Sequence, residues 1–331
     1  MNNITNAQNP FYGQYHTPHE AVPFDRIETE HYEPAILEGI KLQNAEIEAI
    51  IQNPEKADFT NTIEAFEESG KLLDKVVAVF GNMLSAETND DLQELAQKIM
   101  PLLSEHSNNI TLNEKLFARV KEVYNQKETL QLTQEQKQLL ENAYNSFIRH
   151  GANLEGEARE EYRRLTTELS KLTLTFSENN LKETNAYQML LTKKESLAGL
   201  PEIIIEAAAE TAKNEEKEGW AFTLHAPSYI PFMTYSDNRD LRQKLYMAYN
   251  TKCTHDNEFN NIDIVKKIAN TRMKIAQLLG YKDYAEYTLK KRMAENSKSV
   301  YKLLNQLLEA YTPTACLLYT SPSPRDVEES R

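Results

Sequence analysis

The chain contains seven histidines, and their spacing decides whether they could hold a catalytic zinc ion. An HExxH arrangement places two imidazoles on one helix face, four residues apart, with a glutamate that takes a proton from metal-bound water. No histidine here is followed by another four positions later. His19-Glu20 begins like this motif, but Pro23 stands at the second ligand position and would disrupt the helix. We expect His16 and His19 to be solvated, on a mobile N-terminal arm.

Nucleophilic catalysis has equally weak candidates. Ser299 and Lys302 match the SxxK pattern, but two fixed residues in four recur by chance, and this pair lies in an amphipathic stretch. Cys253 is two residues from His255, a spacing that need not bring the side chains together. The carboxylate pairs Asp90-Asp91 and Glu160-Glu161 are typical of helix starts and solvated faces. The residues therefore predict no catalytic, metal-binding or cofactor-binding residue within this chain.

Composition bounds the class of protein. The chain has 331 residues, 40% of them hydrophobic, and only nine glycines, which favours a mainly helical, soluble fold of about two domains. A net charge of −13 should repel nucleic acid and anionic membranes. No apolar run approaches the ~20 residues of a membrane span. The first 15 residues lack a secretory signal, so we expect a cytoplasmic location.

Apolar periodicity places helices throughout residues 25–185, which follow a polar arm at residues 1–24. One helix should begin near Tyr32 and stop at Asn53-Pro54, and a second should follow Thr60 and continue to Leu84. Thr88 with Asp91, and Thr133 with Gln136, are capping-box patterns that would each begin a helix. The clearest core-facing stripe comprises Tyr162, Leu165, Leu169, Leu172 and Phe176.

The pattern changes near Asn185. Residues 188–192 and 220–224 read as short strands around a helix at 203–217, which predicts a small mixed α/β insert over residues 186–235, either a hairpin or a three-stranded patch. Residues 236–315 return to helices, one beginning at Asn238, one ending at Gly280 and one spanning 297–311.

Several stretches in order resemble the M3 family of zinc oligopeptidases. They are PFDRI at 23–27, HYEPA at 31–35, FTNTIEA at 59–65, GWAFTL at 219–224, APSY at 226–229, MTYSDNR at 233–239 and AQLLGY at 276–281. Their order and spacing match over about residues 20–312. The details resemble the family's peptidyl-dipeptidase group most, with the oligopeptidase A group as the near alternative.

The resemblance implies a neurolysin-like fold of two largely helical lobes with a deep channel between them. This chain would supply the N-terminal helical lobe, as a channel wall, and the start of the second. The family's HExxH and third glutamate ligand belong to the second lobe and have no counterpart here. The resemblance thus implies a zinc enzyme in the full-length protein, whose C-terminal lobe is this chain's partner, and an inactive fragment that binds no zinc.

The last residues, 316–331, differ from the family. The stretch CLLYTSPSPRD at 316–326 resembles an in-frame translation of a transposase adapter used in sequencing libraries. We therefore interpret residues 316–331 as an artefactual tail without function.

Three functions remain open from the sequence. The first is a peptidyl-dipeptidase that removes C-terminal dipeptides from short peptides. The second is an oligopeptidase that cuts internal bonds. The third, from another class, is a non-catalytic helical protein that binds peptides or a partner.

Overall fold

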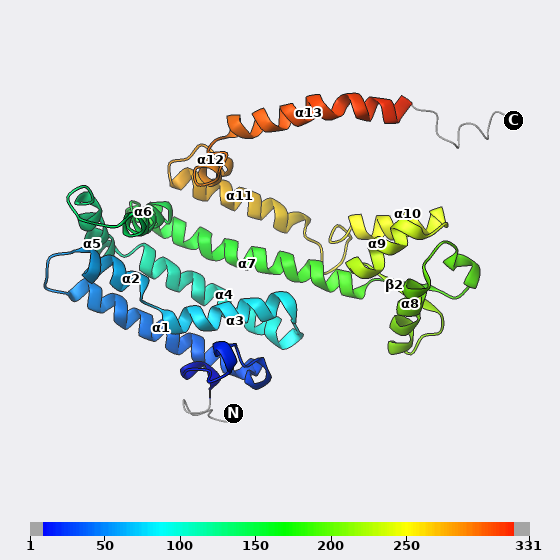
Figure 1. Cartoon of the computed structure of the whole chain (residues 1–331), viewed down its shortest axis with the longest axis horizontal. Coiled ribbons are helices and arrows are strands. Elements are labelled where there is room, and N and C mark those ends of the chain that lie inside the picture. Colours follow the sequence, from blue (N-terminus) through cyan, green and yellow to red (C-terminus); the bar gives the residue numbers. More distant parts are fainter. Residues whose placement is uncertain (1–8, 321–331) are drawn as a thin grey trace. The chain divides into compact units, whose positions relative to one another are not determined.

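A computed structural model describes residues 9–320, which are mostly helical with one two-stranded antiparallel sheet (Figure 1). The chain divides into two compact units, residues 1–271 and 272–331. The prediction of a mainly α protein with a small β-containing insert is confirmed. In the described part, no helix combines the length and the apolar character needed to cross a membrane.

The first unit begins with helices that enclose two apolar clusters. Ile36, Val76 and Phe80 are fully buried in one cluster, and Leu116 and Phe147 are buried in the other. Contacts between α1 and α3, and between α4 and α7, link these helices. The helices are α1 (Thr29–Gln52), α2 (Ala65–Glu67), α3 (Lys71–Ala86), α4 (Asp90–Thr111), α5 (Glu114–Asn125), α6 (Gln134–Arg149) and α7 (Gly156–Ala186).

The predicted continuous helix from Thr60 to Leu84 is wrong. The chain forms a π-helical turn at Phe59–Glu64, then α2, and breaks before α3. The break lies at Gly70, whose φ is +79° and whose N–H donates to the Glu46 carboxylate of α1 at 2.7 Å. A Cβ on Gly70 would lie 2.3 Å from the Gln43 amide nitrogen. Glycine at this position therefore lets the chain turn against α1.

The two predicted capping boxes have different outcomes. At α6, the Thr133 hydroxyl accepts from the Gln136 N–H at 3.2 Å and the Gln136 side chain accepts from the Thr133 N–H at 3.0 Å, which confirms the prediction. At α4 the cap is Asn89, not Thr88, because the Asn89 side-chain oxygen accepts from the Leu92 N–H at 2.8 Å. Asparagine is an equally good cap, so sequence alone does not decide between the neighbours.

The N-terminal segment from residue 9 packs against α1 and α3, which corrects the expectation of a mobile arm for this part. Phe11 is 1% exposed and its ring lies 5.4 Å from that of Tyr32. The Lys75 ammonium of α3 donates to the carbonyls of Phe11 and Gly13 at 3.2 and 2.7 Å. One aromatic side chain and one lysine thus tie the segment to α1 and α3. The rest of the predicted arm, residues 1–8, lies outside the described residues.

Helix α7 runs through the first unit as its longest helix (Figure 1). Tyr162 and Leu165 are buried as predicted, but Phe176 is 37% exposed. Leu169 and Leu172 are half-buried. The predicted stripe therefore faces the core in the first half of α7 and is only partly covered in the second.

The predicted insert contains two strands, β1 (Gln188–Leu191) and β2 (Trp220–Thr223), joined through α8 (Glu202–Asn214). They pair antiparallel, with Met189 opposite Phe222, which excludes the three-stranded alternative for the described residues. Helix α9 (Ala226–Tyr235) packs on β2, and α10 (Arg239–Asn250) packs on α9. Phe222 and Phe232 meet edge to face at 4.6 Å in this third core, where Leu245 is also fully buried. Helix α9 was not predicted.

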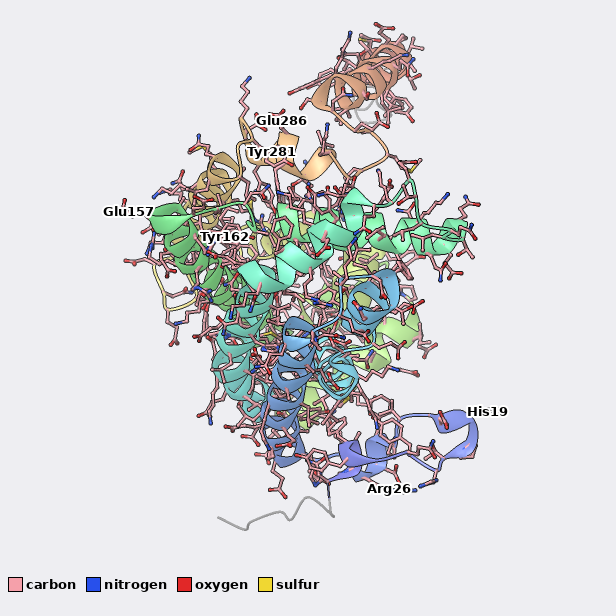
Figure 2. All side chains as sticks on the ribbon, turned by 90° about the vertical axis from the view of Figure 1, so that its left-hand side faces the viewer. His19, Arg26, Glu157, Tyr162, Tyr281 and Glu286 are labelled. Carbon is pink, nitrogen blue, oxygen red and sulfur yellow. The ribbon has the colours of Figure 1, made fainter. Side chains whose placement is uncertain are left out.

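The last three helices are α11 (Ile262–Leu278), α12 (Tyr284–Leu289) and α13 (Ser297–Thr320). Gly280 follows α11 with a φ of +84°, as expected of a residue after a helix C-terminus. Asp283 caps α12 by accepting from the Glu286 N–H at 2.8 Å, and Tyr281 lies near this turn (Figure 2). Helix α13 extends past the predicted Tyr311 and includes the first residues of the adapter-like tail, whose remainder lies outside the described residues.

The buried His106 of α4 should make stability depend on pH. Its side chain is 6% exposed, its Nε2 lies 2.7 Å from the Gln43 amide oxygen, and burial lowers the pKa of its imidazole. Below the unfolded pKa of about 6.5 the unfolded chain therefore binds a proton that the folded chain resists. We expect the free energy of unfolding to decrease as pH falls from 7 to 5. Urea titrations should show a weaker decrease in His106→Gln, whereas an unchanged decrease would contradict this role. Exposed His150→Gln is the control.

Candidate functional site

The two histidines considered for metal binding, His16 and His19, are both exposed. His16 and His19 have positive φ values of 52° and 59°, and His19 lies in a 3₁₀ turn at Pro18–Glu20 rather than in a helix. Figure 2 shows His19 at the outer end of the N-terminal loop, away from Tyr162 of α7. The residues between His19 and Pro23 are therefore not arranged as an HExxH site.

Residues 9–320 contain no group of side chains that matches the zinc site implied by the resemblance. A protein zinc site needs at least three His, Cys, Asp or Glu side chains around one point. No such group of three gathers in this part of the chain. The expectation that this chain supplies no metal ligand stays a prediction.

The serine and carboxylate candidates have local structural contacts. The Ser299 N–H and hydroxyl both bond to the Asn296 side-chain oxygen, at 3.0 and 3.3 Å, at the start of α13. Asp90 and Asp91 occupy the first turn of α4, where the positive end of the helix dipole stabilises negatively charged carboxylates. Glu161 pairs with Arg164 at 2.7 Å on the surface of α7. These contacts show that Ser299, Asp90 and Asp91 lie at helix N-termini and that Glu161 forms a surface ion pair.

One polar cluster joins residues far apart in sequence. Near the end of α7, the Glu183 carboxylate accepts from His255 Nδ1 at 2.7 Å, from Asn257 Nδ2 at 3.5 Å and from the Cys253 N–H. Burial opposes the charged form of Glu183, but these hydrogen bonds outweigh it and hold the pKa of Glu183 below its usual value. Through these hydrogen bonds, the ionised Glu183 connects the turn at residues 251–257 to α7.

This geometry disfavours Cys253 and His255 as a nucleophile and base. Burial, and then the neighbouring Glu183 carboxylate, raise the pKa of the Cys253 thiol to about 11. The His255 ring contacts Glu183 through Nδ1 and the Thr251 hydroxyl through Nε2, at 3.2 Å. A thiol that stays protonated is a poor nucleophile, because the thiolate is the reactive species.

The two cysteines should differ in reactivity. Cys253 is buried and Cys316 is exposed. With a thiol pKa near 11 rather than 9.0, Cys253 should hold about 100-fold less thiolate than an ordinary cysteine, before its burial is considered. Ellman's reagent at pH 8 should modify Cys316 rapidly and Cys253 only on unfolding. The fast phase should vanish in Cys316→Ser and persist in Cys253→Ser. A fast phase that persists in Cys316→Ser would contradict the buried state of Cys253.

Two small cavities border α10. One, of about 440 Å³, has Glu183 and His255 beside apolar walls from Tyr187, Leu224, Met247 and Ala248. The other, of about 400 Å³, is formed by α9 and α10 and contains two arginines, Arg239 and Arg242, with Met233, Gln243, Tyr246 and Met247. Met247 belongs to both. Both cavities place polar side chains beside apolar walls, a composition that they share with small-ligand sites.

Residue-by-residue reasoning did not identify Glu183, because its partners lie about 70 positions further along the chain. Arg239 was noticed only as the last residue of the family-like stretch at 233–239, and Arg242 follows it three positions later. Their regular spacing on one helix turn is the signal that could have singled them out.

Comparisons with known proteins agree on one family. Residues 232–318 match the sequence profile of peptidase family M3. The chain is 34% identical over 305 residues to the dipeptidyl carboxypeptidase of Escherichia coli, covering 92% of this chain and 45% of that protein. It is 31% identical to oligopeptidase A of the same organism and 30% identical to that of Salmonella typhimurium, covering 90% and 88% of this chain and 44% and 43% of those proteins.

The chain spans somewhat less than half the length of these relatives. The stretches that carry the resemblance lie on the 3₁₀ turn Phe24–Arg26, α1, the π-helical turn, β2, α9, the start of α10 and the end of α11. The similarity therefore covers parts of all three apolar clusters. By sequence, the chain is similar to peptidases of family M3.

Proposed function

We propose that this chain is part of a zinc-dependent metallopeptidase that removes C-terminal dipeptides from short peptides. The observation that carries this proposal is the 34% identity, over 92% of the chain, to a protein named dipeptidyl carboxypeptidase. A second dipeptidyl carboxypeptidase, from Salmonella typhimurium, is 33% identical over 91% of the chain. In this proposal the helices and cavities described above form part of the peptide-binding wall, and the zinc ligands lie outside residues 9–320.

An oligopeptidase that cuts internal bonds is the second candidate. Its support is the set of relatives named oligopeptidase A, whose identities of 30–32% are nearly as high as those of the dipeptidyl carboxypeptidases. One Arabidopsis relative is named probable cytosolic oligopeptidase A and another organellar oligopeptidase A. The first of these names supports the cytoplasmic location that we propose for this protein.

The size of the products separates the two candidates. The complete reading frame, read from the source DNA, would be expressed and incubated with an octapeptide, and the products would be identified by mass spectrometry over time. We expect successive losses of C-terminal dipeptides, which stop after treatment with a chelator and return with added zinc. Early internal fragments would favour the oligopeptidase instead.

The 331-residue chain alone is the matched control. We expect it to cleave no peptide, with or without zinc. Chelator-sensitive cleavage by this chain would contradict the inactivity of the fragment. Absence of cleavage by the complete protein as well would favour a non-catalytic helical protein that binds peptides or a partner.

A further inference from the structure

The cavity formed by α9 and α10 is lined by an unusual face of α10. Arg239, Arg242, Gln243, Tyr246 and Met247 follow the spacing i, i+3, i+4, i+7, i+8 and so share one side of the helix. The opposite side carries Leu245, which is fully buried in the third core. Tyr246 and Met247 are 49% and 50% exposed. Helix α10 therefore presents apolar as well as cationic groups to solvent.

The two arginines of this face lack an ion-pair partner among the described residues. Within residues 9–320, neither Arg239 nor Arg242 forms an ion pair, although Asp240 lies between them in sequence. Like charges one helix turn apart repel each other, and no carboxylate lines the cavity. In a chain with 50 acidic and 37 basic residues, two adjacent unpaired guanidinium groups form a local site for an anion.

One of the two guanidinium groups is held in place. An Nη1–H of Arg242 donates to the carbonyl of Ser236, a residue only 3% exposed in the turn between α9 and α10. A guanidinium has five N–H donors, so four remain for other partners. Arg239, in the first turn of α10, is exposed. A fixed arginine beside a free one suits a carboxylate, which arginine can bind through two parallel hydrogen bonds.

The other residues that line the cavity favour an anion with an apolar part over an inorganic anion. Met233, Tyr246 and Met247 supply the apolar part, and methionine adapts its shape to varied ligands. A cavity of about 400 Å³ is within the range of small-ligand sites. We propose that this cavity binds a carboxylate of a short peptide together with a neighbouring apolar side chain. That the ligand is a peptide rests on the proposed function. The carboxylate could be the C-terminal one or that of an Asp or Glu side chain.

Direct binding to the 331-residue chain tests this site without requiring catalysis. The probe is an N-terminally labelled hexapeptide of alanines with leucine before the C-terminal residue, followed by fluorescence anisotropy. We expect Arg239→Gln to weaken binding roughly fivefold, and amidation of the probe's C-terminus to weaken it by a similar factor. Lys244→Gln removes the same charge from α10 outside the cavity and should change the affinity less than twofold. Thermal unfolding would verify that both variants fold.

The other arms identify the source of the anion. If an amidated probe with aspartate before its C-terminal residue regains binding, a side-chain carboxylate suffices. Equal binding of free and amidated probes, or equal effects of Arg239→Gln and Lys244→Gln, would overturn the proposal. So would inorganic phosphate that displaces the probe at the same concentration as acetyl-leucine. Failure of the complete protein to cleave peptides would refute the enzyme proposal and leave a measured binding site intact.

Discussion

Replacing Gly199 with alanine is expected to destabilise the region around the sheet by roughly 3 kcal/mol. Gly199 has a φ of +85°, and a Cβ there would lie 2.3 Å from the carbonyl oxygen of Tyr235 and 2.9 Å from the Asp237 nitrogen. Both neighbours are backbone atoms, which cannot rotate away. The change would also strain the hydrogen bond from the Asp237 N–H to the Ala198 carbonyl, now 2.9 Å long. The turn before α8 and the turn before α10 would have to separate.

Trp220, the only tryptophan, lies on β2 in the same core and can report this effect. The midpoint of urea unfolding, followed by its fluorescence, should fall markedly in Gly199→Ala. Gly81→Ala is the control, because Gly81 lies on the exposed face of α3 with nothing within 4 Å of an added Cβ. That variant should gain roughly 0.5–1 kcal/mol from helix propensity. Equal effects of the two variants would refute the steric argument.

Replacing Phe80 with alanine should cost about 3–5 kcal/mol of stability. The ring is fully buried and lies 5.2 Å from that of Tyr32, which in turn contacts Phe11. Truncation would leave a cavity where α1, α3 and the N-terminal segment meet, and the surrounding helices can fill it only in part. Urea unfolding followed by far-ultraviolet circular dichroism measures the loss.

Phe24→Ala is the matched control for this substitution. Phe24 is 50% exposed, so its removal should change the free energy of unfolding by less than about 0.5 kcal/mol. Similar losses of stability in the two variants would show that the cluster around Phe80 and Tyr32 is not the core of this part of the chain.

The sequence predicted most helices but few of the places where they stop. The end of α1 followed from Asn53-Pro54 and the start of α6 from the Thr133 capping box, which are both local signals. The break at Gly70 depends on Glu46 and Gln43 of another helix, and the burial of Phe11 depends on Tyr32 and Lys75. These contacts are tertiary, so periodicity along one segment cannot reveal them.

The candidate site was less predictable still. The Glu183 cluster joins the end of α7 to a turn about 70 residues later, and no local pattern in the sequence connects the two segments. The unpaired state of Arg239 and Arg242 becomes visible only when their surroundings are known. The family resemblance supplied the enzyme class, because it compares many positions together, whereas the individual residues of this chain predicted no chemistry.

The most direct test of the central claim, relationship to a complete M3 peptidase, is long-read sequencing of the source DNA beyond the codon for Ala315. The claim predicts that the reading frame continues, without the codons of residues 316–331, into an HExxH motif followed by a further glutamate. A genome that encodes residues 316–331 and then a stop codon would contradict both the enzyme and the adapter interpretations. A helical binding protein would then be the better account.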